Sequence, residues 1–222
     1  MHFILNIDTA VKTASVCLSK DGVSMSLAVN TEPRDSAAWL HVAIQQLMQQ
    51  QNMQLQQLHA IAVSAGPGSY TGLRVGMATA KGLCYALQKP LITISTLQMM
   101  AAATQNVTTD LICPMIDARR MEVFTAIFDR SLNEVVAPAA IILNEDTFVE
   151  LLNEKSITFL GNGSSKFQAV MQHPRAFYTD VTANAAHLAT LAHTKLISNN
   201  FTDLAYAEPA YGKEFYSPAH NK

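Results

Sequence analysis

The sequence predicts an α/β fold with two similar lobes, each built on a mixed sheet with packed helices. Three apolar strands follow one another near the start of each half of the chain: residues 3–7, 14–18 and 24–29, then 111–116, 122–128 and 134–143. Asp8 and Asp117 end the first strand of each set, where open sheets expose ligand-facing residues. Helical and strand–helix segments follow both sets, which favours helices on mixed sheets. The repeated order indicates a duplicated unit.

This duplication divides the chain into a first lobe of residues 1–103 and a second lobe of residues 104–222, whose tail can return to the first lobe. In the first lobe, Asp35 and Ser36 are good N-caps for a helix that buries Leu40, Ile44 and Leu47. The glutamine-rich end of this helix is expected to be a solvated surface. In the second lobe, residues 145–152 and 184–197 predict helices, with a turn at residues 161–163 between them.

Composition and charge restrict the function classes. The 222 residues are 49% hydrophobic and 14% charged, enough to bury a sizeable core. The net charge of −2 supplies no basic field, so strong direct RNA binding is disfavoured.

Cysteine usage and hydropathy indicate the compartment. Cys17, Cys84 and Cys113 form no Cys-x-x-Cys pair, which predicts free thiols in a reducing compartment such as the cytoplasm. No segment approaches about 18 uninterrupted apolar residues, and the N-terminal region has no basic segment before its apolar strand. Neither secretion nor membrane insertion is expected.

A glycine-rich run at residues 66–76 joins a predicted strand to a predicted helix that continues to Leu87. Backbone N–H groups at such a junction can bind an anion. The alternative is a tight turn without a ligand, because no Lys-Ser or Lys-Thr pair completes a phosphate-binding loop. The candidate anion or nucleotide contacts are Asp8, Gly68, Ser69, Thr71, Arg74 and Asp117.

The helix that follows this run has a narrow polar side and many small residues, including Gly76 and Gly82. Interior glycines cost about 1 kcal/mol each relative to alanine, so a second backbone close to this helix is expected. We interpret the helix as an interface with another chain; packing against the first helix of the same chain is the alternative. The candidate partner interface consists of Trp39, Val42, Tyr70, Leu73, Arg74, Gly76, Met77, Ala80 and Lys81.

Three arginines need anionic partners. Arg74 lies in the first turn of the predicted helix, where a cation opposes the helix dipole. A carboxylate or phosphate from a ligand or partner would offset this cost, and simple solvent exposure is the alternative. Arg119 and Arg120 follow Asp117 and are expected to form structural ion pairs with Asp8 or Asp117.

Four motifs stand out together: Ile7-Asp8-Thr9, the run from Gly66 to Gly76, Asp117-Ala118-Arg119-Arg120 with Glu122-Val123-Phe124, and Gly161-Asn162-Gly163. In this combination they resemble the TsaB (YeaZ) family of bacterial tRNA threonylcarbamoyladenosine biosynthesis proteins, in the actin/Hsp70/sugar-kinase-like (ribonuclease H-like) superfamily. The motifs span most of the chain, and the run to Arg74 is the most specific. The chain departs from the family at Asp35, where a histidine is usual, so any role of that histidine is not carried over.

The resemblance implies a non-catalytic, activating subunit rather than an enzyme. Such a subunit dimerises with the catalytic paralogue TsaD and works with the ATPase TsaE. Their complex adds a threonylcarbamoyl group to N6 of the adenosine next to the anticodon, in tRNAs that read codons beginning with A. The family docks through its first two helices and forms a homodimer when TsaD is absent. The resemblance therefore implies no cofactor of its own, ATP or ADP and metal on the partner subunits, and only indirect contact with tRNA.

The alternative is an independent nucleotide-binding enzyme of the kinase or ATPase type. An active kinase of this superfamily needs glycine-containing phosphate loops in both lobes. Asp8-Thr9-Ala10 lacks that glycine, and so does Asp117-Ala118-Arg119-Arg120. A catalytic metal site is also not expected, since His187 and His193 are six residues apart and would lie on nearly opposite sides of a helix.

Overall fold

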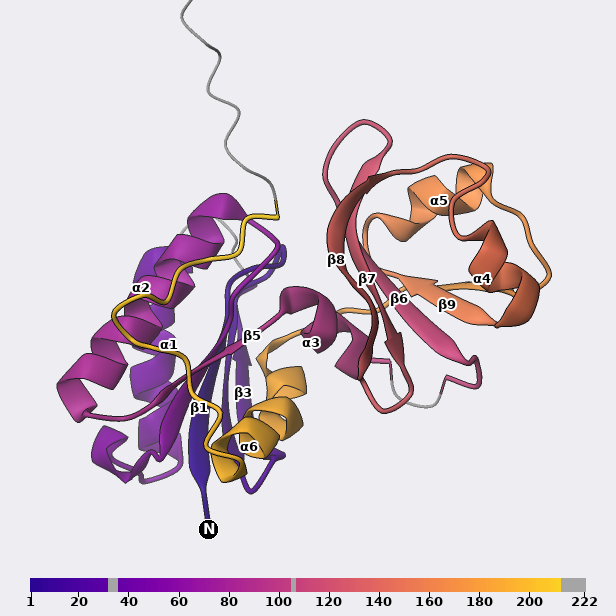
Figure 1. The fold of residues 1–222 in the computed structure, drawn as a ribbon. Helices are drawn as coiled ribbons and strands as arrows, with labels where there is room; N and C mark the ends of the chain where they lie inside the picture. Colours follow the sequence, from indigo (N-terminus) through magenta and orange to yellow (C-terminus); the bar gives the residue numbers. More distant parts are fainter. Residues whose placement is uncertain (32–35, 105–106, 213–222) are drawn as a thin grey trace, which may run out of the picture.

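A computed structural model of the chain describes residues 1–31, 36–104 and 107–212, arranged as two five-stranded sheets (Figure 1). The first sheet has the order β3-β2-β1-β4-β5 and the second the order β8-β7-β6-β9-β10. The first contains β1 (Phe3–Asp8), β2 (Ser15–Lys20), β3 (Val23–Val29), β4 (Ala60–Ser64) and β5 (Leu91–Ile94). The second contains β6 (Leu111–Asp117), β7 (Glu122–Asp129), β8 (Glu134–Ile142), β9 (Ile157–Leu160) and β10 (Ala176–Thr179).

The two sheets share one topology, which confirms the predicted duplication. In each, the first three strands form an antiparallel meander, and the last two run parallel to the first strand. Leu5 pairs with Leu18 on one side and Ile61 on the other, as Leu111 does with Asp129 and Ile157. All six predicted meander strands are present, with ends within two residues of the predicted ones.

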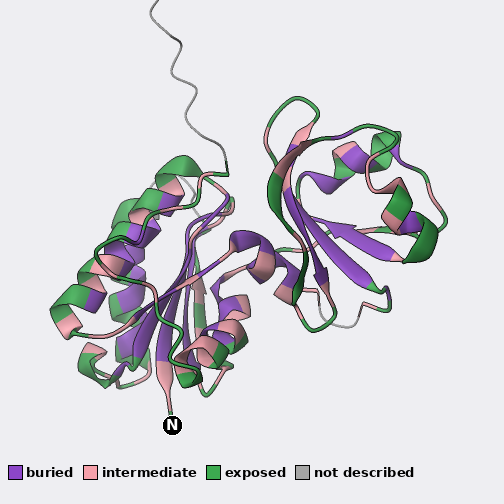
Figure 2. Ribbon diagram, in the orientation of Figure 1, coloured by how far each residue is buried: buried purple, intermediate pink, exposed green. Residues whose placement is uncertain are grey.

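Helices cover both faces of the first sheet. On one face, α1 (Ser36–Gln50) and α2 (Tyr70–Leu87) pack against Leu5 and Ile7. On the other, the 3-10 helix η3 (Ala185–Leu188) and α6 (Ala189–Ile197) pack against Ile4. Alternate side chains of one strand point to opposite faces, so a single run of apolar residues in β1 serves both cores. The strands β1, β2, β4 and β5 are consequently buried, whereas the edge strand β3 and the outer helix faces are mostly exposed (Figure 2).

The helix α3 (Thr96–Ala102) lies between the lobes, where it packs against both sheets (Figure 1). In the second lobe, α4 (Val149–Glu154) and α5 (Ser164–Val170) cover one face of the sheet. The aromatic rings of Phe159 and Phe167, with centroids 4.8 Å apart, lie in that core.

Two predicted helices differ from the structure. The segment 145–152 becomes helical only at Val149, because the Asn144 side chain accepts from the Asp146 N–H and Thr147 hydroxyl, which organises a turn instead. The segment 184–197 forms two helices, η3 followed by α6. The predicted first helix does bury Leu40, Ile44 and Leu47, while its proposed cap at Asp35 falls outside the described residues.

The segment after α6 runs along the first lobe. The N–H of Thr202 donates to the Leu91 carbonyl at 2.9 Å, and the N–H of Ala210 donates to the Ala65 carbonyl at 2.7 Å. The boundary between residues 103 and 104 stays a prediction. None of the helices in the described part of the chain combines the length and apolar character needed to cross a bilayer.

Candidate functional site

A cavity of about 580 Å³ opens between the two lobes. The first lobe contributes the loop of residues 10–13 together with Gly68 and Ser69, and the second contributes Asp117, Gly161 and Asn162. Residues 180–183, which lead from β10 to η3, complete the lining. The structure therefore brings together three of the six candidate anion contacts: Gly68, Ser69 and Asp117.

Asp8 lies beneath the cavity rather than in its lining. Its side chain is fully buried, and its Oδ1 atom accepts hydrogen bonds from Ser64 Oγ at 2.6 Å and from the N–H of Ala10 at 3.0 Å. Burial raises the pKa of Asp8 to about 6, against the lowering effect of these two hydrogen bonds. The Asp8 carboxyl group thus stabilises the backbone of the loop after β1, through its hydrogen bond with the Ala10 N–H, and does not line the cavity.

Two backbone amides that could have faced an anion are used within the chain. The N–H of Ser69 donates to the Ala10 carbonyl at 2.8 Å, and the N–H of Gly72 donates to Ser69 Oγ, the N-cap of α2, at 3.2 Å. A Cβ atom at Gly68 would lie 2.4 Å from the Ala10 carbonyl oxygen. Close packing of this loop on the loop after β1 accounts for the glycine.

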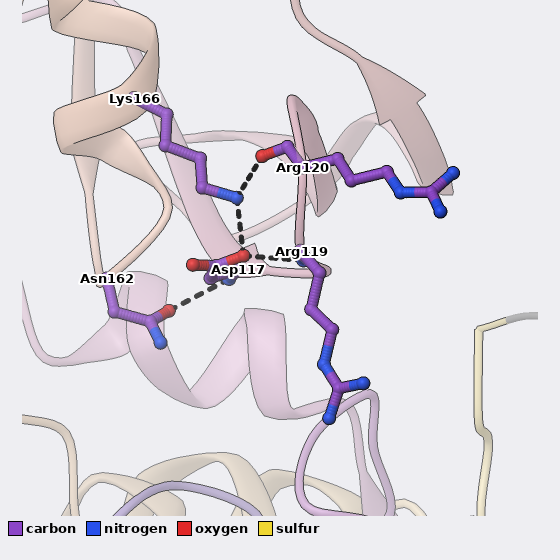
Figure 3. Close-up of polar contacts among 5 residues, drawn as sticks. All are labelled: Asp117, Arg119, Arg120, Asn162 and Lys166. Atoms are coloured by element: carbon purple, nitrogen blue, oxygen red, sulfur yellow. Dashed lines mark hydrogen bonds and ion pairs between the residues drawn. The ribbon is translucent and has the colours of Figure 1, made fainter.

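In the second lobe, Asp117 is held by three neighbours (Figure 3). Its Oδ1 atom accepts from Lys166 Nζ at 2.6 Å and from the N–H of Arg119 at 2.6 Å, and its own N–H donates to Asn162 Oδ1 at 2.9 Å. The hydrogen bond from Lys166 is the main cause that holds the pKa of Asp117 below its usual value. Asp117 is accordingly a carboxylate with a fixed orientation.

The predicted pairing of the Arg119 or Arg120 side chain with Asp117 is wrong. Both side chains extend away from the carboxylate in Figure 3, and Lys166 makes the ion pair instead. Lys166 Nζ also donates to the Arg120 carbonyl. Lys166 is the third residue of α5, the helix that follows residues 161–163. The sequence analysis did not predict this helix, so it did not consider Lys166.

Gly72 and Gly76 of α2 face the loop that follows the chain's own first strand. A Cβ atom at Gly72 would lie 2.0 Å from the Thr9 carbonyl oxygen, and one at Gly76 would lie 2.2 Å from Thr9 Oγ1. Leu73, Gly76, Met77 and Ala80 are all buried within the described chain. These four members of the candidate interface pack inside the chain, and their contact with a partner stays a prediction.

The two cations of α2 contact the segment that follows α6. Arg74 Nε donates to the Tyr211 hydroxyl at 3.0 Å, and its guanidinium lies 4.1 Å from the centre of the Tyr70 ring. Lys81 Nζ donates to the carbonyls of Ala205 and Ala207 at 3.2 and 2.9 Å. Within the described chain, the Tyr211 hydroxyl and the rings of Tyr70 and Tyr211 contact Arg74, and an anionic group from a ligand or partner stays a prediction.

The outer face of α1 and α2 keeps several apolar groups in solvent. Val42 on α1 is 51% exposed, and Tyr85 on α2 is 81% exposed. A Cβ atom at Gly82, one turn before Ala86, would meet nothing within 4 Å among the described residues. Of the other predicted interface residues, Tyr70 is exposed and Trp39 is half-buried.

The sequence analysis did not include Tyr85 in the candidate interface, because it chose interface residues by the positions of the small residues of α2. The sequence carries one signal for it: Tyr85 lies three residues after Gly82 and seven after Ala78, both also exposed. These positions share one side of a helix. We define the outer face as Val42, Ala78, Gly82, Tyr85 and Ala86.

Comparison with known proteins places the chain in a family. The family profile of TsaD, described as tRNA N6-adenosine threonylcarbamoyltransferase, matches residues 30–210. The tRNA threonylcarbamoyladenosine biosynthesis protein TsaB of Bacillus subtilis is 31% identical over 173 residues, covering 76% of this chain and 75% of the relative. The protein of the same name from Escherichia coli is 35% identical over 134 residues, covering 60% of this chain and 57% of the relative.

A solved structure gives the same result for the fold. YeaZ from Pseudomonas aeruginosa superposes with a TM-score of 0.81 at 26% identity, over 95% of this chain and 100% of that chain. The predicted fold class, a two-lobed arrangement of mixed sheets with packed helices in the actin-like superfamily, is confirmed. The chain therefore belongs to the TsaB (YeaZ) family of tRNA threonylcarbamoyladenosine biosynthesis proteins.

Proposed function

We propose that this chain is a non-catalytic subunit of the complex that adds a threonylcarbamoyl group to N6 of the adenosine next to the anticodon of tRNA. In this proposal it binds the catalytic paralogue TsaD, works with the ATPase TsaE, and reaches tRNA only through the complex. ATP or ADP and any metal used in the reaction belong to the partner subunits. The three free, buried thiols agree with a cytoplasmic location.

The non-catalytic role is supported by the loops that line the interlobe cavity. A phosphate loop needs unoccupied backbone amides and room for phosphate oxygens. Here the amides of Ala10 and Ser69 donate within the chain. Ala10 stands where a kinase of this superfamily would need a glycine, and Lys166 already neutralises Asp117. The local chemistry of both lobes therefore disfavours triphosphate binding.

In this proposal, the docking surface is the outer face of α1 and α2. The exposure of this face is the main observation that supports the proposed function. Tyr85 on α2 is 81% exposed and Val42 on α1 is 51% exposed, so each presents apolar area that binding would remove from water. Gly82, which is exposed on α2, lets a partner helix approach the α2 backbone closely. We propose that a second copy of the chain occupies this face when TsaD is absent.

Copurification with TsaD from the same organism tests the docking surface. Tyr85→Arg and Val42→Arg place a charge on the outer face, and each is expected to weaken TsaD binding at least tenfold, about 1.4 kcal/mol or more. Ile142→Arg is the matched control, because Ile142 is 70% exposed on β8 of the other lobe. Unchanged TsaD binding by both outer-face variants would remove this surface from the proposal.

An independent nucleotide-using enzyme is the second candidate, and the cavity of about 580 Å³ between the lobes favours it. Calorimetric titration of the isolated chain with ATP, followed by a hydrolysis assay, separates the two candidates. We expect neither micromolar binding nor turnover by the chain alone. Turnover by the isolated chain would favour the enzyme, whereas activity that requires TsaD and TsaE would favour the subunit.

A further inference from the structure

Three segments that are distant in sequence meet at the N-terminal end of the first lobe, near the label N in Figure 1. They are the start of β1, the turn between β2 and β3, and the helix α6. His2, Asp21 and His193 each contribute one ligand atom there, and the three atoms lie within 4.8 Å of one another. The sequence analysis did not find this group because it compared only the spacing of histidines along the chain.

The backbone fixes the carboxylate at this point. Asp21 and Gly22 form a two-residue hairpin turn with φ values of 49° and 83°, the left-handed pair that such a turn requires. The N–H of His2 donates to Asp21 Oδ1 at 2.7 Å, and the N–H of Asp21 donates to the His2 carbonyl at 2.9 Å. Asp21 is therefore oriented before any ligand binds.

The helix α6 is fixed against the same turn. Thr190 Oγ1 donates to the Gly22 carbonyl at 3.1 Å. One turn further along α6, His193 packs on Gly22 so closely that a Cβ atom there would lie 3.3 Å from His193 Cβ. Both residues lie on one side of the helix, so His193 projects toward Asp21 from a rigid element.

The ligand atoms of the cluster suit a cation. The buried Nε2 atom of His193 has no hydrogen-bond partner among the described residues. His2 Nδ1 lies 3.8 Å from Asp21 Oδ1, too far for a hydrogen bond.

We propose that His2, Asp21 and His193 form a binding site for a divalent transition-metal ion, with Zn²⁺ the best match. Two imidazole nitrogens and one carboxylate oxygen are ligands that Zn²⁺ takes in tetrahedral sites, and a water molecule completes the four. Bond lengths of about 2.0–2.2 Å place tetrahedral ligands roughly 3.4 Å apart. Rotation of the partly exposed His2 ring supplies the small closure that this requires.

The ion would join α6, from the second half of the chain, to the start of the first strand.

His59 supports this geometry without being a ligand. Its ring lies edge-on to His2, with centroids 5.4 Å apart, and its Nδ1 atom accepts from the Phe3 N–H at 3.1 Å. We infer a structural role, because the site lies at the start of β1, whereas the loop that lines the interlobe cavity follows the end of β1.

Calorimetric titration of the untagged chain with Zn²⁺ near neutral pH tests this site. A histidine tag would bind the same metals, so it is omitted. We expect one Zn²⁺ per chain, a Kd of about 1 μM or tighter, and a rise in the unfolding temperature. His193→Gln and Asp21→Asn are each expected to weaken Zn²⁺ binding at least tenfold, and Asn retains the left-handed turn and the acceptor for His2.

His173→Gln is the matched control, since His173 lies in the second lobe next to β10. This variant should bind Zn²⁺ as the unchanged chain does. Circular dichroism spectra establish that each variant is folded before titration. Absence of one-to-one Zn²⁺ binding by the unchanged chain would overturn the proposal. So would His193→Gln and Asp21→Asn variants that bind Zn²⁺ as tightly as the unchanged chain does.

Discussion

Gly76 of α2 lies directly against Thr9, and a Cβ atom at position 76 would come within 2.2 Å of Thr9 Oγ1. The same hydroxyl donates to the carbonyl of Gly72 at 2.7 Å, one turn earlier in the helix. These two glycines let α2 approach the loop after β1 closely enough to form that hydrogen bond. Gly72 and Gly76 are thus requirements of the chain's own fold.

Gly76→Ala and Gly82→Ala form a matched pair with opposite expected effects on stability. The first forces a methyl group against Thr9 and should lower the free energy of unfolding by about 1–3 kcal/mol. The second adds a methyl group in open space on the same helix and should raise it by about 1 kcal/mol, through helix propensity. Urea unfolding followed by circular dichroism measures both, and a loss of similar size in both variants would contradict this account.

The meanders were predictable because each strand carries a local signal. Apolar alternation marks the strands, and Asp21-Gly22 marks a hairpin turn that the structure confirms. The short β5, β9 and β10 carry only four residues each, too few for a periodic pattern to be distinguished from a helix or loop. Their place is set by pairing with strands that lie far away in the sequence: β5 pairs with β4, β9 with β6 and β10 with β9.

The candidate site was less predictable, because burial decides which side of a helix faces inward. Gly76 indicated a close neighbour correctly, whereas Gly82 has none within 4 Å among the described residues. The sequence offered another chain or the first helix as that neighbour, and the structure shows Thr9. Likewise, Asp117 was recognised as a carboxylate at a strand end. Its partner Lys166, 49 residues further along, became visible only once α5 was placed beside it.

Asp8 gives the protein a pH-dependent stability of a definite sign. Its pKa rises from 3.8 in the unfolded chain to about 6 in the folded protein, so the folded state binds the proton more tightly. The resulting stabilisation, about 3 kcal/mol, is complete below pH 3.8 and is lost as the pH rises through 6. In Asp8→Asn, this contribution to the pH dependence is removed.

Chemical unfolding at several pH values measures this effect as the difference between Asp8→Asn and the unchanged chain. That difference should shift by about 2 kcal/mol in favour of the variant between pH 4 and pH 7, most of the full effect. Ser64→Ala provides a second test. Removing the Ser64 hydrogen bond should raise the pKa of Asp8 further and move the transition to higher pH. A difference that stays constant with pH would refute the assignment.

Lys166→Met should raise the pKa of Asp117 toward its usual value, because the variant loses the ammonium group 2.6 Å from Oδ1. Arg119→Gln is the control, since only the backbone N–H of Arg119 contacts the carboxylate and its side chain extends away (Figure 3). A much smaller pKa change is expected in that variant. NMR titration of the Asp117 carboxyl carbon reports both values, and equal changes would show that net charge rather than the Lys166 contact matters.

Lys81 fixes the segment after α6 to the outer side of the first lobe. Lys81→Met keeps the length of the apolar stem but removes the donors to the carbonyls of Ala205 and Ala207. Because hydrogen bonds from charged groups contribute about 1.5–3 kcal/mol, the segment should open more often, and the amides of Ala207 and Ala210 should exchange roughly 10–100 times faster. Hydrogen exchange followed by NMR measures this. Lys12→Met, with an exposed side chain in a different loop, should leave both rates unchanged, and equal exchange in the two variants would show that Lys81 does not hold the segment.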